Sequence, residues 1–203
     1  SENVSTTDFT GFTVEINDIA ATITGISGTG TTQLTLTITE EIYGGQTVTV
    51  SYDDATGNIF DLADNASASF TDQAVTNNAT TILVADLSEL RSQATGSTVY
   101  RVAGELLVSH ISGNSRDQRY VKDDGAGLLI DDNTPVIPSN ALVAGDLISG
   151  LEGTITEFAN TLQLVPTSVP TVLSSGNEIT PITVTIADYN ANPNTYESRF
   201  IRF

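Results

Sequence analysis

The sequence predicts an all-β protein, an Ig-like β-sandwich followed by a five-stranded OB-like barrel with one short helix. Apolar and polar residues alternate with a period of two along much of the chain, which is the pattern of half-buried strands. Glycine-rich breaks separate these runs at short intervals, as in sandwiches and barrels. The pattern changes near residues 77–80, and a length of 203 residues suits two small domains.

The first domain is expected over residues 1–79. Residues 12–16, 34–38 and 48–52 each carry an apolar side chain at every second position. The residues between them are mostly threonine, which favours strands while remaining polar. We therefore expect strands with one buried face and one exposed, hydroxyl-rich face.

One helix is predicted just after the boundary. Asp86 and Glu89 have the spacing of a capping box at a helix start. The apolar residues that would share one face of this helix are Leu87, Leu90 and Ala94. Gly96 is expected to end the helix.

The second domain is expected over residues 80–203. Its predicted strands are a bent one over 99–109 with Gly104 at the bend, a hairpin of 119–121 and 127–130, and a hairpin of 147–155 and 162–165. A bent first strand, two hairpins and a late strand outline an OB barrel. Residues 200–203 begin an alternating strand without a continuation, so we expect the barrel to be incomplete at its C-terminus.

Four segments of the first domain read DFTGFTV at 8–14, TVTVSY at 47–52, NIFDLADNA at 58–66 and FTDQAVTN at 70–77. They resemble the SwmB-type bacterial Ig-like repeat. The chain departs from that repeat at Asp64, where a glycine is usual, and in lacking the first strand of the repeat. The resemblance implies an Ig-like fold over residues 1–78.

Six segments of the second domain carry a second resemblance: 87–93, 100–105, 120–123, 127–132, 145–153 and 196–199. Through them the domain is similar to an OB-like domain of large secreted surface proteins of the Bacteroidota. Together the two resemblances imply an exported accessory module, without catalytic residues to carry over, in a piece of a longer protein or in domains completed by strands of another chain.

The charge balance is strongly acidic. Asp and Glu number 25 and Lys and Arg 7, for a net charge of −18, and residues 1–80 hold 11 acids and no Lys or Arg. Because nucleic-acid binding draws on basic surface, we expect no nucleic-acid partner. No apolar run approaches the length of a membrane span, so we expect no membrane insertion.

The residues give little support to catalysis. His110 is the only histidine, cysteine is absent, and no Gly-x-Ser-x-Gly elbow surrounds a serine. The carboxylate pairs lie mostly at adjacent, turn-like positions, where solvated loop residues are common. We predict that the chain is not an enzyme and name no catalytic residue.

Calcium is the one metal that the sequence suggests. Hard oxygen ligands from a flexible loop are what calcium requires, and residues 53–65 are rich in them. The candidate ligands are Asp53, Asp54, Asn58, Asp61 and Asp64. Weaker candidates are Asp123-Asp124 and Asp131-Asp132-Asn133. The alternative is that these residues form turns, for which Asp and Asn are well suited.

The densest basic cluster lies where an OB barrel usually binds ligands. Its members are Arg116, Arg119, Tyr120 and Lys122. Tyrosine can stack on a sugar, and arginine can anchor a carboxylate or phosphate. The alternative is that these cations pair with neighbouring aspartates.

Taken together, the sequence predicts a non-catalytic, extracellular structural or adhesive module of a large secreted surface or filament protein. Assembly through β-strand complementation would use copies of the chain or neighbouring domains as partners. A carbohydrate-binding module with a polysaccharide ligand, or an accessory region of a secreted hydrolase, are the alternatives.

Overall fold

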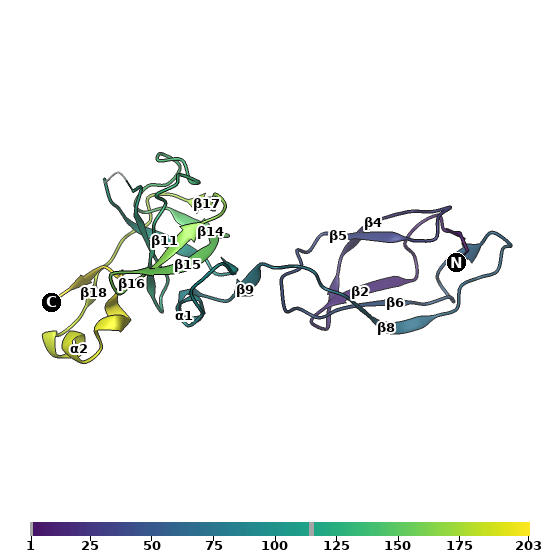
Figure 1. Cartoon of the computed structure of the whole chain (residues 1–203), viewed down its shortest axis with the longest axis horizontal. Coiled ribbons are helices and arrows are strands. Elements are labelled where there is room, and N and C mark those ends of the chain that lie inside the picture. The colour runs from purple at the N-terminus through teal and green to yellow at the C-terminus, as the bar shows by residue number, and fades with distance from the viewer. Residues whose placement is uncertain (1, 114–115) are drawn as a thin grey trace. The chain divides into compact units, whose positions relative to one another are not determined.

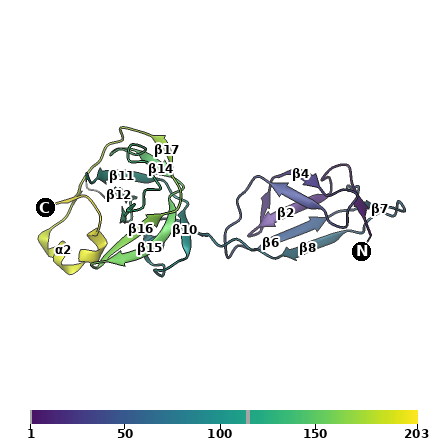
Figure 2. The same cartoon turned by 45° about the horizontal axis from the view of Figure 1, so that its top comes forward.

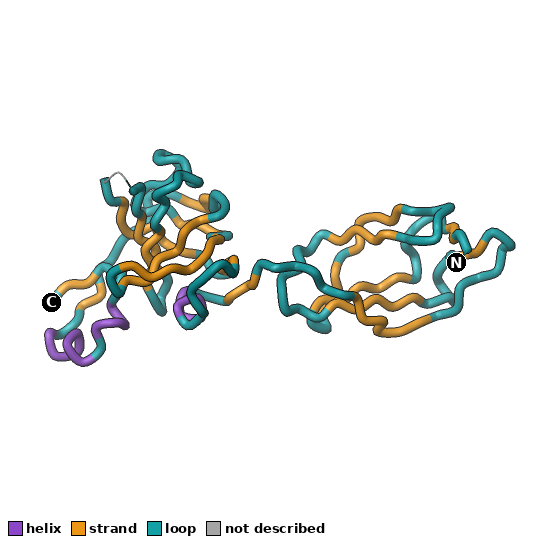
Figure 3. The backbone as a smooth tube through the Cα atoms, viewed as in Figure 1, coloured by secondary structure: helices purple, strands orange, loops and turns teal. Residues whose placement is uncertain are grey.

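A computed structural model describes residues 2–113 and 116–203. The chain divides into two compact units, residues 1–79 and 80–203. Strands dominate both units, and the only helices in the described ranges are α1 (Leu87–Arg91), α2 (Ile186–Ala191) and the 3-10 turn η1 (Pro193–Tyr196) (Figures 1 and 3). The predicted all-β fold is confirmed.

The first unit consists of two facing sheets. Its strands are β1 (Val4–Ser5), β2 (Phe12–Ile16), β3 (Ile19–Ala21), β4 (Ile23–Ser27), β5 (Thr35–Ile38), β6 (Val48–Tyr52), β7 (Phe60–Asp61) and β8 (Phe70–Val75). One sheet has the order β3-β2-β6-β8, and β4 and β5 form the other; both layers are visible in Figure 1. β1 pairs with β7 at one end. The three alternating runs of the sequence thus lie in β2, β5 and β6.

Tyr52 is the centre of the first unit's core. Its ring is 2% exposed and lies 5.0 Å from the ring of Phe12 and 6.0 Å from that of Phe70. Its hydroxyl accepts a hydrogen bond from the backbone N–H of Ile59 at 2.9 Å. Few other side chains in this unit are fully buried, because the alternating strands bury one face only.

The second unit is a curled sheet. Its strands are β9 (Ile82–Val84), β10 (Val99–Val102), β11 (Leu106–Ile111), β12 (Arg119–Lys122), β13 (Gly127–Ile130), β14 (Leu147–Ser149), β15 (Glu152–Phe158), β16 (Thr161–Pro166), β17 (Thr171–Ser174), β18 (Ile182–Thr183) and β19 (Ile201–Arg202). The order within the large sheet is β17-β14-β11-β12-β13-β16-β15-β10-β9. Figure 2 shows β10, β15 and β16 side by side.

Two bent segments close this sheet into a barrel. The predicted strand over 99–109 is divided at Gly104 into β10 and β11, which pair with β15 and β14 respectively. The predicted strand over 147–155 is likewise divided at Gly150, whose φ of +70° favours glycine. Each bent segment therefore pairs with the other on both sides of its bend. Counted as the first and fourth strands of an OB barrel, the two segments are hydrogen-bonded to each other, and this pairing closes the barrel.

Helix α1 begins as the sequence predicts. The carboxylate of Asp86 accepts the N–H of Glu89 at 2.8 Å, and the Glu89 carboxylate accepts the N–H of Ala85 at 2.6 Å. Leu87 and Leu90 are fully buried in the barrel core. The helix ends at Arg91, before Ala94, and a turn and bends over residues 92–98 lead from its C-cap Ser92 to β10.

The prediction of a single helix is wrong, since α2 and η1 also form. At the start of α2, the Thr185 hydroxyl accepts the N–H of Asp188 at 3.1 Å. This Thr-x-x-Asp signal is in the sequence, but no residue of α2 is buried, so no apolar helical period accompanies it.

Downstream, residues 201–202 pair with β18 as a short parallel strand.

Candidate functional site

The predicted basic cluster divides between the two faces of β12. Successive side chains of a strand point to opposite sides. Arg119 and Val121 point into the barrel and are buried, whereas Tyr120 and Lys122 are half-buried on the other face. The four predicted ligand-binding residues therefore do not form one surface.

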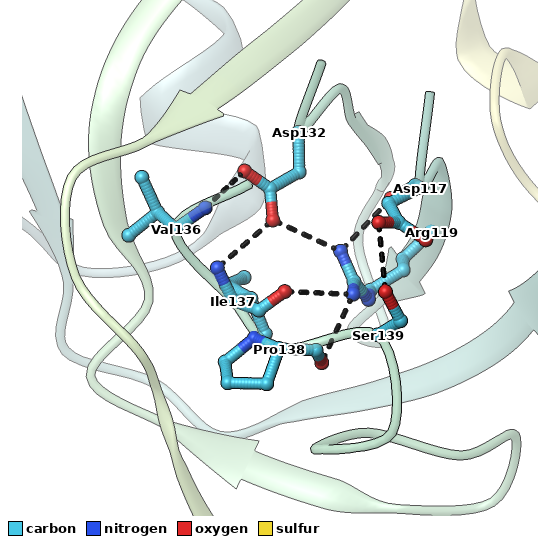
Figure 4. Close-up of polar contacts among 7 residues, drawn as sticks. All are labelled: Asp117, Arg119, Asp132, Val136, Ile137, Pro138 and Ser139. Atoms are coloured by element: carbon cyan, nitrogen blue, oxygen red, sulfur yellow. Dashed lines mark hydrogen bonds and ion pairs between the residues drawn. The ribbon is translucent and has the colours of Figure 1, made fainter. Parts of the chain in front are cut away.

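Arg119 lies in the barrel interior, 1% exposed (Figure 4). Its guanidinium pairs with the Asp132 carboxylate at 3.2 Å. It also donates to the carbonyl oxygens of Asp117, Ile137 and Pro138 at 2.8, 3.1 and 3.3 Å. One buried donor, Nε, has no hydrogen-bond partner. Arg119 therefore acts as an internal cross-link between β12 and the loop after β13.

Asp132 completes this cross-link from the other side. Its two carboxylate oxygens accept the N–H groups of Val136 and Ile137 at 2.8 and 2.9 Å (Figure 4). Nearby, the Ser139 hydroxyl donates to the Asp117 carboxylate at 3.0 Å. These bonds satisfy backbone groups of an irregular loop that the sheet ladder does not reach.

Arg116 is likewise engaged by a neighbouring aspartate. Its Nε donates to Asp131 Oδ1 at 2.9 Å, and its Nη2 forms an ion pair with Asp131 Oδ2. Gln118 also donates to Asp131, at 3.1 Å. The hydrogen bonds from Arg116, aided by Gln118, hold the pKa of Asp131 below its ordinary value, and the same bonds raise the pKa of Arg116.

The assignment of Arg116 and Arg119 as ligand-binding residues is therefore corrected. Both guanidiniums are bound to aspartates, which is the alternative that the sequence left open. The carboxylates of Asp131 and Asp132, the weaker metal candidates, accept hydrogen bonds from protein donors in the same way.

Tyr120 lies in a different environment, an open pocket of about 450 Å³. The residues that line it are Ser109, His110, Tyr120, Ser198, Arg199 and Phe200. His110 and Tyr120 are neighbours on β11 and β12, with ring centroids 5.8 Å apart. Lys122, on the same face, donates to the carbonyl oxygen of Thr180 at 3.4 Å.

The other wall of the pocket comes from the C-terminal segment. The Arg199 guanidinium donates to the carbonyl oxygens of Gly125 and Asp124, both at 2.9 Å, and this ties the segment to the β12–β13 turn. Ser198 has a φ of +59°, in the left-handed region, and its buried hydroxyl has no hydrogen-bond partner. Phe200 is half exposed. Sequence reasoning missed these residues as site residues, because nothing local indicates that they meet β11 and β12.

The pocket wall combines aromatic and polar side chains. It carries the rings of Tyr120 and Phe200, the imidazole of His110, the guanidinium of Arg199 and two serines. Ser109, next to His110, donates its hydroxyl to the carbonyl oxygen of Tyr120 at 3.1 Å. That hydroxyl is thus engaged with the backbone. Aromatic faces with a few polar groups are typical of a small polar ligand site.

The five candidate calcium ligands are spread over separate turns. Asp54 bonds with Ser69, and Asn58 bonds with Thr6, Thr7 and Asp8. Asp53 accepts from Ala55 N–H at 3.0 Å. Asp64 is exposed, with a φ of +61°.

Asp61 illustrates the structural role of these carboxylates, which is to accept hydrogen bonds within a turn. It accepts from the side chain and N–H of Asn65 and from the N–H of Ala63, and the bonds from Asn65 lead in lowering its pKa. Within residues 2–113 and 116–203, no group of three or more Asp, Glu or His could hold a metal ion. The described contacts of these side chains are those of turn formation, which is the alternative that the sequence left open, and the calcium site stays a prediction.

Comparison with known proteins places no family name on the chain. No family model matches, and no curated protein matches. Two solved structures are similar at 14% identity. The crystal structure of the tetrameric p202 HIN2 has a TM-score of 0.35 and covers 86% of this chain and 96% of its own. That of the p204 HINb domain has a TM-score of 0.30 and covers 81% of this chain and 95% of its own.

One sequence-based expectation is corrected by these findings. The expectation that nucleic acid is not a partner is withdrawn in view of the likeness to HIN domains. Its physical weakness is that net charge is a sum over the whole molecule, whereas binding depends on the local surface. At these TM-scores the likeness gives no argument for a nucleic-acid function either.

No helix within the described ranges is long and apolar enough to cross a membrane.

Proposed function

We propose that this chain is a non-catalytic structural or adhesive module of a large extracellular surface protein. The observation that carries the proposal is the use of its charged groups. Arg119, Asp132 and Arg116 bind one another or neighbouring backbone, and the loop carboxylates hold turns. Groups that an enzyme would expose at a reacting centre serve here to fix irregular loops between strands.

The surface of the chain supports the same proposal. Thr-rich strand faces and a net charge of −18 favour solubility at high local concentration. The resemblance to secreted Bacteroidota domains points to the cell exterior as the location. A filament or adhesin subunit needs these properties and needs no reactive group.

Surface labelling tests this proposal. An antiserum raised against the folded 203-residue chain should stain intact cells of the organism that encodes it. Mild protease treatment of those cells should release fragments that the antiserum detects. A cytoplasmic protein that stays undetected until the cells are permeabilised is the control. Staining that requires permeabilisation would contradict the proposal.

A specific observation favours carbohydrate binding as a second candidate function. The pocket beside Tyr120 is of the size of small-ligand sites, which are about 300–1,000 Å³. Tyr120 and Phe200 can contact the apolar face of a sugar ring, while the Ser109 and His110 side chains lie at the same pocket. Arg199 is the charged residue among the described lining residues, and its guanidinium already donates to the carbonyl oxygens of Gly125 and Asp124.

Replacing Tyr120 by Ala is expected to weaken glycan binding about tenfold, which corresponds to about 1.4 kcal/mol of lost ring contact. A glycan array identifies a neutral oligosaccharide ligand, and calorimetry gives the dissociation constants. Phe158→Ala is the matched control, because Phe158 is 69% exposed in the same unit and does not line the pocket. An array with no ligand, equal losses in both variants, or preference for single-stranded DNA over every sugar would rule this candidate out.

A further inference from the structure

On one side of the first unit the chain passes from β3 in one sheet to β4 in the other through Thr22 alone. β5 and β8 are the end strands of these two sheets that no such short connection joins. In the described part of this unit β5 pairs with β4 and β8 with β6, and the outer edges of β5 and β8 pair with no strand.

An apolar groove of about 420 Å³ lies between the two sheets. One wall is formed by Leu34, Leu36 and Ile38, and the other includes Val14, Val50 and Val75. Protein interiors leave few voids larger than a water molecule. A groove of this volume therefore exceeds the ordinary packing defects of a sandwich core.

The side chains of the groove remain partly in contact with solvent. The inward-facing side chains of β5 are only half-buried, namely Leu36 and Ile38, and so is Leu34 just before the strand. Val75 at the rim is 46% exposed. The strand pattern thus provides an apolar face that the unit alone does not cover, and exposed apolar patches of this kind mark interaction sites.

An extended peptide strand matches both features at once. Apolar side chains at every second position would enter the groove, with the same period of two as β5. Its backbone N–H and C=O groups would pair with a free edge of β5 or β8, as in β-strand addition. A compact apolar ligand would fill the groove and leave both edges unpaired.

Charge decides which strand fits. Exposed acids lie beside both edge strands: Glu40 and Glu41 follow β5, and Asp72 lies in β8, while residues 1–79 hold no Lys or Arg. A second copy of this chain would bring the same excess of negative charge, which opposes close approach. A strand with basic outward residues would be attracted to this acidic surface, and a neutral strand would not be repelled by it.

We propose that the groove between β5 and β8 binds a neutral-to-basic β-strand of another polypeptide, which completes the sandwich. This inference rests on the proposed structural or adhesive function and names its partner. It does not depend on the sugar pocket, which lies in the other unit.

A synthetic peptide tests the groove directly in the full chain. The probe is Lys-Val-Thr-Val-Lys-Val-Thr-Val-Lys, within the usual length of a strand. We expect saturable binding at least tenfold tighter than that of a control peptide with its central Lys replaced by Pro, which lacks one backbone donor. Amide exchange within β5 or β8 should slow in the complex.

Two variants locate the binding. Leu36→Lys and Val75→Lys change partly exposed lining residues from the two walls, so the fold should persist, as circular dichroism can verify. Both should lose peptide binding. Ile19→Lys, at a 72% exposed position outside the groove, is the control and should keep it.

Three outcomes would overturn the inference. The two peptides could bind equally, the complex could leave exchange at β5 and β8 unchanged, or the chain alone could form oligomers that the peptide dissociates, which would make a second copy the occupant. None of these outcomes alters the cell-surface staining expected of the proposed function, so failure of one proposal is distinguishable from failure of the other.

Discussion

Replacing Arg119 by Ala should lower the free energy of unfolding of the barrel unit by about 3–5 kcal/mol. The substitution leaves the Asp132 carboxylate, whose side chain is 0% exposed, without its cation. It also removes the donor from the carbonyl oxygens of Asp117, Ile137 and Pro138. A buried charge without its partner costs far more than the pair contributes net of desolvation.

A matched ion pair in the same unit serves as the control. Arg101 and Glu152 are 3.5 Å apart and partly exposed, so Arg101→Ala should cost no more than about 1 kcal/mol. A denaturant titration followed by amide signals of β11 to β13 reports on the barrel alone. The double variant Arg119→Met with Asp132→Asn should recover part of the loss, because it removes both buried charges. Equal losses for Arg119→Ala and Arg101→Ala would show that the cross-link is not important for folding.

Local patterns in the sequence predicted local structure well. The period-two runs became β2, β5 and β6, and the Asp123-Asp124-Gly125 turn joins β12 to β13. The cap of α1 forms with the expected Asp86 contact. In each case the information lies within a few residues, where hydrogen-bond geometry and side-chain alternation act directly.

The candidate site was harder to predict, for two physical reasons. The residues Arg116, Arg119, Tyr120 and Lys122 are close in sequence, but neighbouring side chains of a strand point to opposite faces, so the cluster does not form one surface. Its aspartate partners lie 13 to 15 positions away in sequence and were brought close by the β12–β13 hairpin. The far wall of the pocket is formed by Ser198 to Phe200, which are held there by contacts between residues more than 70 positions apart in the sequence.

The calcium prediction contains a different ambiguity. A run of Asp and Asn satisfies the chemistry of a cation site and of a series of turns equally well. What separates the two is whether the oxygens converge. Here Asp61 and Asp53 point back to backbone N–H groups of their own turns, and spacing along the chain does not reveal that direction.

Replacing Tyr52 by Ala should lower the free energy of unfolding of the first unit by about 3–5 kcal/mol, the usual cost of deleting a buried aromatic ring. The ring is 2% exposed and packs between Phe12 and Phe70. Because this unit has few fully buried side chains, it has little other apolar burial to offset the loss. Amide signals of β2 and β6 during denaturation measure the effect.

Two further substitutions separate the contributions of Tyr52. Tyr52→Phe removes the hydroxyl that accepts from Ile59 N–H and should cost about 1–3 kcal/mol, since that buried donor loses its acceptor. Tyr43→Phe is the control, because the Tyr43 hydroxyl donates to Glu41 in an exposed position, and its cost should stay within about 0.5 kcal/mol. A Tyr52→Phe variant as stable as Tyr43→Phe would remove the hydrogen bond from the explanation.

Gly57 provides the sharpest test of the same contact. A Cβ at Gly57 would overlap the ring and hydroxyl of Tyr52, so Gly57→Ala should destabilise the unit in the presence of the ring. Once Tyr52 is Ala, the space is free and the added methyl should cost much less. Residues in contact are expected to deviate from additivity by about 0.5–3 kcal/mol. Additive losses in the double variant would mean that the destabilisation by Gly57→Ala arises elsewhere, and that Tyr52 is not the side chain that requires glycine there.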